Sequence, residues 1–371
     1  MKKIWILIIV IVIIIVAIVI FYKPKPREVI KIGVVLPLSG SASTYGISAK
    51  EGIDLALEEL NATQKRKIEL IYEDDQCNPE KAVDAAQKLI NVDSVRIIIG
   101  HICSSAALAV APIAEKNKVI LFSPGASAPD YKNAGDYIFR NRQDISDEVS
   151  KTAEIVKNFN INKIAMIYVN NDYGVSSKDI FTKRFEELGG KVELAESYQQ
   201  DATDFRTQLT KIKKAEPEAM FLAGLIKESA TIIKQSSELG LKVRIFSTIG
   251  VEGKELLEIA GPAAEGIIYS APFFDVKSTD PIVKEFINRY KEKYKKDPTY
   301  VFAANGYDAL EILNSAVKKC DTNTDCIKDQ LYKIKDYPGA SGMTTFDQNG
   351  DVSKPIMIKT IKNGQFVPYE E

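Results

Sequence analysis

The chain has 371 residues, more than one hydrophobic core usually supports, so we expect two domains. Its 49 Lys and Arg residues are balanced by 50 Asp and Glu residues, which leaves a formal net charge of −1. This balance argues against a protein that binds nucleic acid or another polyanion.

The first predicted element is a membrane segment. Ile4 to Phe21 form an uninterrupted apolar run that would span about 27 Å as a helix, close to the hydrocarbon thickness of a bilayer. The run is longer than the apolar region of a cleaved signal peptide, and no lipobox cysteine follows it. We therefore expect residues 1–28 to be an uncleaved signal anchor and spacer on a single-pass membrane protein. A signal peptide cut at an unusual site is the alternative.

From Val29 onward, short apolar runs alternate with amphipathic helical segments. In the first block the predicted strands are VIKIGVVLPL, KIELIYED, VRIIIG and VILFSPG, separated by helices at 48–60, 79–91 and 105–116. In the second block the predicted strands are KIAMIYVN, KVELAESY, AMFLAGL, RIFST and GIIYS, with helices at 146–159, 177–188, 205–213 and 228–239. This rhythm predicts an α/β protein with parallel sheets covered on both faces, in two lobes of related fold.

The last third of the chain carries two further predicted helices, at 281–294 and 304–318. Periodicity alone leaves open which of the two lobes they join.

The four cysteines favour disulfide bonds over a metal site, because there is no CxxC pair and His101 is the only histidine. Cys320 and Cys326 are close enough in sequence to pair, which leaves Cys77 with Cys103. Disulfides form in oxidising compartments, so we expect the main domain outside the membrane. Buried free thiols are the alternative.

On an extracytoplasmic domain, the sequon at Asn61 is a candidate glycosylation site. Chance sequons are common, so its use stays open.

Polar residues follow two neighbouring predicted strands, where ligands bind in open parallel sheets. Ser104 and Ser105 open a helix directly after a strand, so hydroxyls, free N–H groups and the helix dipole point at one spot that suits an anion. Ser127 follows the next strand, after Gly125 and Ala126, whose small size would allow a ligand close to the backbone. Ordinary N-caps and turn residues are the alternative interpretation.

Two tyrosines, Tyr45 and Tyr173, also follow predicted strands, one in each block. A ring from each lobe would enclose an apolar group in a cleft between them. Packing at the rim of a loop is the alternative.

Catalytic chemistry has little support in the sequence. The chain has no GxGxxG after its first strand, no GxxxxGK[ST], no HExxH and no GxSxG. His101 follows an apolar strand, which favours a structural role, and no nucleophile is paired with an activating base. We expect a protein that is not an enzyme and that uses no cofactor or metal.

From about Val29 to its end, the sequence resembles a known family. The stretch IIIGHICSSAALAVAPIAEKNKVILFSPGASAPDY, supported by IKIGVVLPLSG, STYGISAKEGIDLALEELN, YEDDQCNPEKAV and NNDYG, is similar to the leucine/isoleucine/valine-binding proteins, type I periplasmic binding proteins that serve ABC importers. The resemblance implies two Rossmann-like lobes joined by three crossovers. The first lobe would comprise 29–145 and 276–347, and the second 146–275 and 348–371. It also implies a disulfide between Cys77 and Cys103.

The resemblance implies a binding site as well. The carboxylate-binding positions of the family fall on Ser104 and Ser127, with backbone groups of Gly125 and Ala126 nearby. Its aromatic wall falls on Tyr45, Tyr173 and Phe302.

Two positions depart from the family pattern. The acidic residue that holds the ligand's ammonium aligns with Ile249, and another tyrosine of the second lobe aligns with Leu225. An apolar residue cannot neutralise a buried cation. Glu252 and Asp172 are candidates to replace the missing acid, and solvated surface charges are the alternative reading of both.

The expected function is that of an extracytoplasmic substrate-binding protein for an ABC importer. It would act as a monomer that captures a small carboxylate-bearing solute by lobe closure and then docks on the permease subunits. A branched-chain or other apolar amino acid is the first candidate ligand. A binder of amides, urea or aromatic acids is one alternative, and a ligand-sensing module that needs a transmembrane partner is another.

Overall fold

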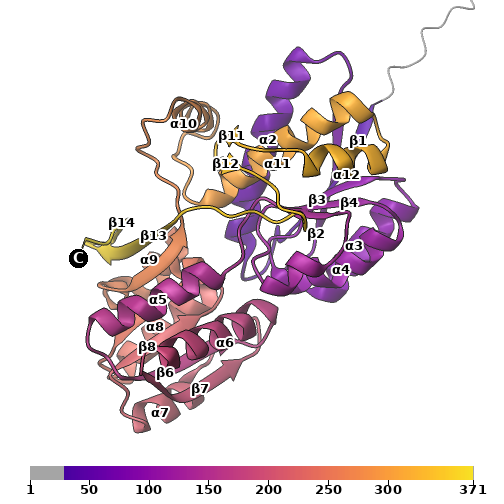
Figure 1. The fold of residues 1–371 in the computed structure, drawn as a ribbon. Coiled ribbons are helices and arrows are strands. Elements are labelled where there is room, and N and C mark those ends of the chain that lie inside the picture. The colour runs from indigo at the N-terminus through magenta and orange to yellow at the C-terminus, as the bar shows by residue number, and fades with distance from the viewer. Residues whose placement is uncertain (1–28, 371) are drawn as a thin grey trace, which may run out of the picture.

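The computed structural model describes residues 29–370, which form two lobes, each built around one β-sheet (Figure 1). The predicted membrane segment Ile4 to Phe21 lies outside the described residues. Within 29–370, no helix combines the length and apolar character needed to cross a membrane.

The first lobe contains five parallel strands in the order β2-β1-β3-β4-β5. They are β1 (Ile30–Leu36), β2 (Ile68–Asp74), β3 (Ile97–Gly100), β4 (Ile120–Ser123) and β5 (Ile138–Arg140). The central strands β3 and β4 are buried along their whole length, which explains why they are continuous apolar runs without alternation.

Helices cover both faces of this sheet (Figure 1). One face packs against α2 (Ser43–Thr63), α11 (Val301–Cys320) and α12 (Thr324–Tyr332), and the other packs against α3 (Pro79–Asn91) and α4 (Ser104–Lys116). A further helix, α10 (Pro281–Tyr294), packs beside α2. The helices of the last third of the chain therefore cover the first lobe, the point that periodicity left open.

The second lobe contains a seven-stranded sheet in the order β14-β13-β10-β9-β8-β6-β7, in which β13 and β14 pair antiparallel at one edge. Its strands are β6 (Lys163–Val169), β7 (Lys191–Tyr198), β8 (Ala219–Ala223), β9 (Arg244–Ser247), β10 (Ile268–Pro272), β13 (Ile356–Lys362) and β14 (Gln365–Pro368). One face packs against α5 (Ser146–Asn158) and α6 (Asp172–Glu187), and the other against α7 (Arg206–Lys214), α8 (Ile226–Glu238) and α9 (Lys254–Ala260).

The chain passes between the lobes three times: from β5 to α5, from β10 to α10, and from the small hairpin of β11 (Tyr337–Gly339) and β12 (Gly342–Thr344) to β13. The α/β fold with parallel sheets that the sequence predicted is thus confirmed. The numbered domain boundaries stay a prediction.

Three predicted helix starts were wrong by three to five residues. The helix predicted from Ser48 begins at Ser43, the one predicted from Ser177 begins at Asp172, and the one predicted from Ala304 begins at Val301. Short elements were also missed: β5, the β11–β12 hairpin, the β13–β14 hairpin, α9 and α12.

Both expected disulfides are present, Cys77–Cys103 and Cys320–Cys326, which excludes the free-thiol alternative. His101 is fully buried, and its Nδ1 lies 2.5 Å from Oδ2 of the equally buried Asp75. This contact fits the structural role expected for His101 at the end of β3.

Candidate ligand-binding site

A cavity of about 50 Å³ lies between the two lobes, at the carboxyl ends of strands from both sheets. It is lined by Tyr45, Ile102, Cys103, Ser104, Gly125, Ser127, Arg142, Asn171, Tyr173, Gly224, Leu225, Ile249, Gly250 and Phe302. Eight of the ten predicted site residues are therefore brought together around one cavity. The other two, Ser105 and Ala126, do not line it.

The amino ends of five helices converge on this cavity. Tyr45, Ser104, Tyr173 and Phe302 lie in the first turns of α2, α4, α6 and α11, and Leu225 is the residue that precedes α8. The positive end of each helix dipole lies at its amino end. The arrangement favours a ligand that carries negative charge.

The Ser104 hydroxyl is held in place by the neighbouring loop. Its Oγ accepts hydrogen bonds from the backbone N–H groups of Ser127, at 3.1 Å, and Ala128, at 3.0 Å. Because both lone pairs of Oγ are engaged, the hydroxyl proton is directed elsewhere and is available to an acceptor in the cavity. Cys103, at the N-cap position, provides no side-chain cap to α4, so N–H groups of its first turn also lack a side-chain partner.

The backbone N–H groups expected to contact a carboxylate at Gly125 and Ala126 have a different partner. Both donate to Oγ of Ser123, at 3.2 and 2.8 Å, and the Ser123 hydroxyl donates to the carbonyl of His101. Gly125 still lines the cavity, packed so tightly that an added Cβ would lie 2.7 Å from Cα of Ile102. Gly125 therefore gives the cavity space, while its N–H group is directed at Ser123.

Ser105 bridges the lobes instead of lining the cavity. Its Oγ accepts a hydrogen bond of 3.1 Å from the backbone N–H of Asp172, at the start of α6. Other contacts also join the lobes. They include Lys227 Nζ to the carbonyl of Gly40 at 3.0 Å, Gln200 Nε2 to the carbonyl of Gln76 at 3.2 Å, and Thr44 to Glu255. The lobes are therefore closed on each other.

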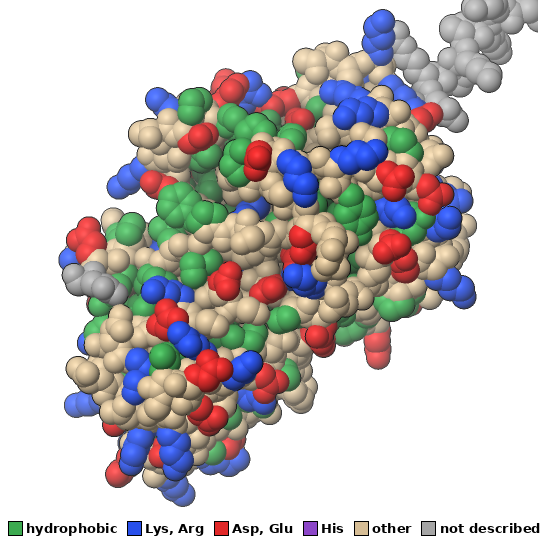
Figure 2. Space-filling view, in the orientation of Figure 1, with side chains coloured by type: hydrophobic (Ala, Val, Ile, Leu, Met, Phe, Trp, Pro, Cys, Tyr) green, Lys and Arg blue, Asp and Glu red, His purple; other side chains and the backbone are tan. Residues whose placement is uncertain are grey.

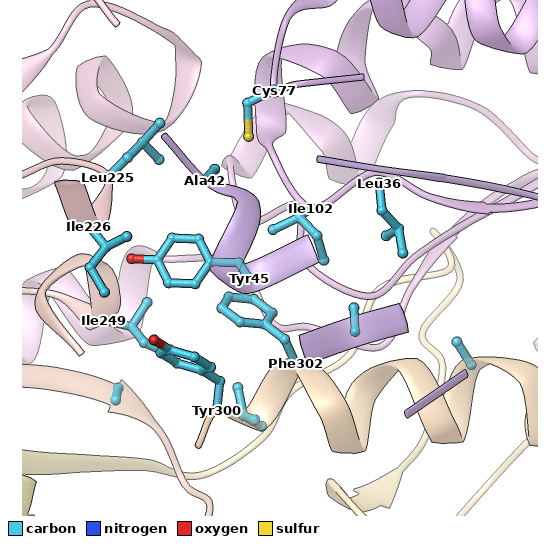
Figure 3. Close-up of a cluster of buried hydrophobic side chains, with 14 of the residues drawn as sticks. Leu36, Ala42, Tyr45, Cys77, Ile102, Leu225, Ile226, Ile249, Tyr300 and Phe302 are labelled. Carbon is cyan, nitrogen blue, oxygen red and sulfur yellow. The ribbon is translucent and has the colours of Figure 1, made fainter. Parts of the chain in front are cut away.

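Aromatic and aliphatic side chains form most of the cavity wall. The ring of Tyr45 packs against Phe302, with centroids 5.2 Å apart, and edge-to-face against Tyr300 at 5.5 Å. Figure 3 shows the hydroxyl end of Tyr45 directed toward Leu225 and Ile226 of the second lobe. Residues of both lobes thus meet in one apolar surface, as expected for an enclosed apolar ligand group.

Tyr173 closes the wall from the second lobe. Its hydroxyl contacts Thr248, and burial raises its pKa to about 12, so the ring remains neutral. Asn171 caps α6 by accepting a hydrogen bond of 3.0 Å from the backbone N–H of Gly174, which fixes the turn on which Tyr173 lies.

Neither candidate for the missing acid lies at the cavity. Glu252 forms an ion pair with Lys359, and Asp172 is exposed. Ile249 lies in a single 3₁₀ turn, Ile249–Val251, and lines the cavity directly. In the described part of the chain, no aspartate or glutamate lines this cavity.

Arg142 is the principal residue that the sequence analysis missed. It follows β5, a strand of three residues that had not been predicted, so its position at a strand end was not recognised. The guanidinium is almost fully buried and forms a 2.6 Å ion pair with Oε1 of Glu148 in α5. Burial raises the pKa of Glu148 to about 7, although Arg142 opposes this shift.

Comparisons with known proteins agree with this architecture. Residues 29–365 match the sequence model of a family described as periplasmic binding protein. A binding protein for leucine, isoleucine, valine, threonine and alanine from Pseudomonas aeruginosa is 27% identical over 349 residues, which cover 92% of this chain and 90% of that protein.

Two solved structures are also similar. A leucine-binding protein from Thermotoga maritima superimposes with a TM-score of 0.87 at 31% identity, covering 92% of this chain and 98% of that one. A solute-binding protein of an ABC transporter from Rhodopseudomonas palustris, in complex with 3,4-dihydroxybenzoic acid, superimposes with a TM-score of 0.81 at 25% identity, covering 91% and 95%.

Proposed function

This chain belongs to the periplasmic binding protein family, and from that membership we propose that it is the extracytoplasmic substrate-binding protein of an ABC importer. The observation that carries the proposal is a cavity between two lobes, lined by the hydroxyls of Ser104 and Ser127 and by an apolar wall. Such a cavity binds its ligand by closure and releases it by opening, with no covalent chemistry.

We propose that the ligand is a small carboxylate-bearing solute, with a branched-chain or other apolar amino acid as the first candidate. Its carboxylate would accept hydrogen bonds from the hydroxyls of Ser104 and Ser127 and from the N–H groups of the first turn of α4. Its apolar side chain would lie against Tyr45, Tyr173 and Phe302. The names of the relatives from P. aeruginosa and T. maritima support this choice.

A carboxylate without an ammonium group, such as an aromatic acid, is the second candidate. The observation that favours it is the cavity lining, which in the described residues includes Ile249 and no acidic side chain. A buried ammonium without an anionic partner is costly. The R. palustris neighbour was solved with an aromatic acid of this kind.

We further propose that the protein is held at the outer face of a membrane by its first 28 residues and delivers ligand to the permease subunits as a monomer. The uninterrupted apolar run from Ile4 to Phe21 supports the anchor, and the two disulfides support an oxidising compartment. On the face shown in Figure 2, acidic and basic side chains are interspersed over both lobes, which fits a partner that is not a polyanion.

Isothermal titration calorimetry with leucine, isoleucine, valine, threonine, alanine and benzoate tests the proposed function. We expect saturable one-to-one binding of at least one of these carboxylates. Replacing both hydroxyls, with Ser104→Ala and Ser127→Ala, removes two charge-assisted hydrogen bonds and should weaken that binding roughly 100-fold.

Two further variants separate binding from folding. Ser127→Ala alone leaves the Ser104 hydroxyl, which holds the loop, in place and should weaken binding about tenfold. Ser237→Ala changes an exposed serine of α8 and should have no effect. Unchanged affinity in the double variant would refute this site, and the failure of every carboxylate to bind the parent protein would refute the function.

A further inference from the structure

Arg142 is the one charged residue that lines the cavity in the described part of the chain. It follows β5 of the first lobe, yet its partner Glu148 belongs to α5 of the second, so the ion pair lies where the chain first crosses between the lobes. Nη1 of Arg142 also donates a 2.9 Å hydrogen bond to the carbonyl of Gln143. These two contacts fix the guanidinium in one orientation.

Glu148 is fully buried and does not line the cavity. A ligand in the cavity therefore meets the guanidinium and not the carboxylate that balances it. Arg142 and Tyr173 line the same cavity. Burial raises the pKa of the Tyr173 hydroxyl, Glu148 raises it further and Arg142 lowers it.

We propose that Arg142 selects among ligands by the substituent beside the carboxylate. It favours a hydrogen-bond acceptor, such as a carbonyl or hydroxyl oxygen, over an ammonium group. This inference rests on the proposed binding of a carboxylate at Ser104 and Ser127. Arg142 lines the same cavity as those two serines, so a ligand bound to them shares the cavity with the guanidinium.

The physical reason is the sign of the charge. A guanidinium has donors and no acceptor, so it bonds to an oxygen and repels an ammonium, and burial strengthens both effects. Among the described residues, Ile249 lines the cavity and no acidic side chain does, so no carboxylate in its lining offsets that repulsion. The ligand class that fits is a 2-oxo, 2-hydroxy or aromatic carboxylic acid with an apolar body.

Leucine and 4-methyl-2-oxopentanoate provide a matched test, because they share a carbon skeleton and a carboxylate and differ in the ammonium and the carbonyl. We expect calorimetry on the protein at pH 8 to show that the 2-oxo acid binds at least about tenfold more tightly than leucine.

The key variant combines Arg142→Met and Glu148→Gln, which removes both charges together and leaves no unpaired buried ion. In this variant the ratio of the two affinities should fall to within about threefold of unity. Arg244→Met removes an exposed positive charge of the second lobe and should leave the ratio unchanged. The parent and all variants are first compared by thermal unfolding without ligand, so that a misfolded protein is not read as a change in preference.

The outcomes separate this inference from the proposed function. Tighter binding of leucine by the parent protein, or the same ratio in the parent and the double variant, would refute the role of Arg142 and leave the proposed function standing. Failure of the parent to bind both ligands, and benzoate as well, would refute both.

Discussion

At the scale of single residues, the site depends on groups whose partners restrict what they do. The Ser104 hydroxyl is saturated as an acceptor, so only its proton is left to bond a ligand in the cavity. Gly125 contributes space, and Ile249 contributes an apolar surface where the family pattern has an acid. The sequence suggested that Ser104 contacts the ligand. It could not show that Ser104 is a donor, because the N–H groups that occupy its oxygen belong to the loop of Ser127 and Ala128.

We expect Gly125→Ala to weaken both folding and binding. The added Cβ would lie 2.7 Å from Cα and 2.9 Å from the carbonyl oxygen of Ile102, which are backbone atoms that cannot move alone. Overpacking of this kind costs about 1–3 kcal/mol of unfolding free energy. Urea unfolding and calorimetry check the two effects, and a variant with parental stability and affinity would contradict the tight packing described here.

Glu311 predicts a pH dependence of stability. Burial, followed by repulsion from Glu59, raises its pKa from 4.5 to about 7. The folded protein then binds this proton more tightly than the unfolded chain does, so stability falls as pH rises from 4.5 to about 7 and remains lower above that.

Glu311→Gln should remove this penalty. Because Glu311 is only partly buried and solvent screens its charge, we expect a gain of about 1 kcal/mol in unfolding free energy at pH 8 and almost none at pH 5. Urea unfolding at both pH values measures the difference. The exposed Glu292→Gln is the control, and an equal gain at the two pH values would be inconsistent with the raised pKa.

At the scale of elements, the strands and their order of appearance were predictable because buried parallel strands are short apolar runs. Helix starts were not predictable in the same way, and the three wrong starts are in helices whose first turns line the cavity. Tyr45 and Phe302 lie in first helical turns that the predicted starts left out, and neither helix has a side-chain cap. Asn171, three residues before Gly174, was a readable cap signal that would have extended α6 correctly.

The β13–β14 hairpin was predictable and was missed. Asn363 and Gly364 both have positive φ, the requirement of a tight hairpin turn, and an Asn-Gly pair between two apolar runs is a strong signal for it. β5 carried no comparable signal, because its three residues are too short for any period to be detected. Because β5 was missed, the position of Arg142 at the end of a strand was missed as well.

The two disulfides should differ in their contribution to stability. Cys77–Cys103 closes a sequence separation of 26 residues and Cys320–Cys326 one of 6. By loop entropy, their removal should cost about 3.5 and about 2.2 kcal/mol respectively. Double Cys→Ala variants of each pair, compared by urea unfolding, test this order.

Only the first of these removals should also weaken ligand binding, because Cys103 lines the cavity and precedes α4. A larger loss of stability from the Cys320–Cys326 pair would contradict the entropic argument.

At the scale of the whole molecule, closure depends on a few polar contacts across the cleft. Two of these contacts are removed by Lys227→Ala and Gln200→Ala. Together the changes should make closure less favourable by about 1 kcal/mol and weaken binding about fivefold. Calorimetry measures the affinity, and small-angle scattering measures the compaction on adding ligand. Lys234→Ala, on an exposed face of α8, is the control.

Unchanged affinity in that double variant would mean that the apolar wall alone drives closure.

The convergence of helix ends has a consequence for release. Three of the five, from α2, α4 and α11, belong to the first lobe, and two, from α6 and α8, belong to the second. Opening the lobes separates these dipoles and admits water, so the electrostatic field that holds an anion exists in full only in the closed form. A transporter that opens the lobes therefore needs no competing group to displace the solute, because opening itself removes the electrostatic stabilisation of the bound anion.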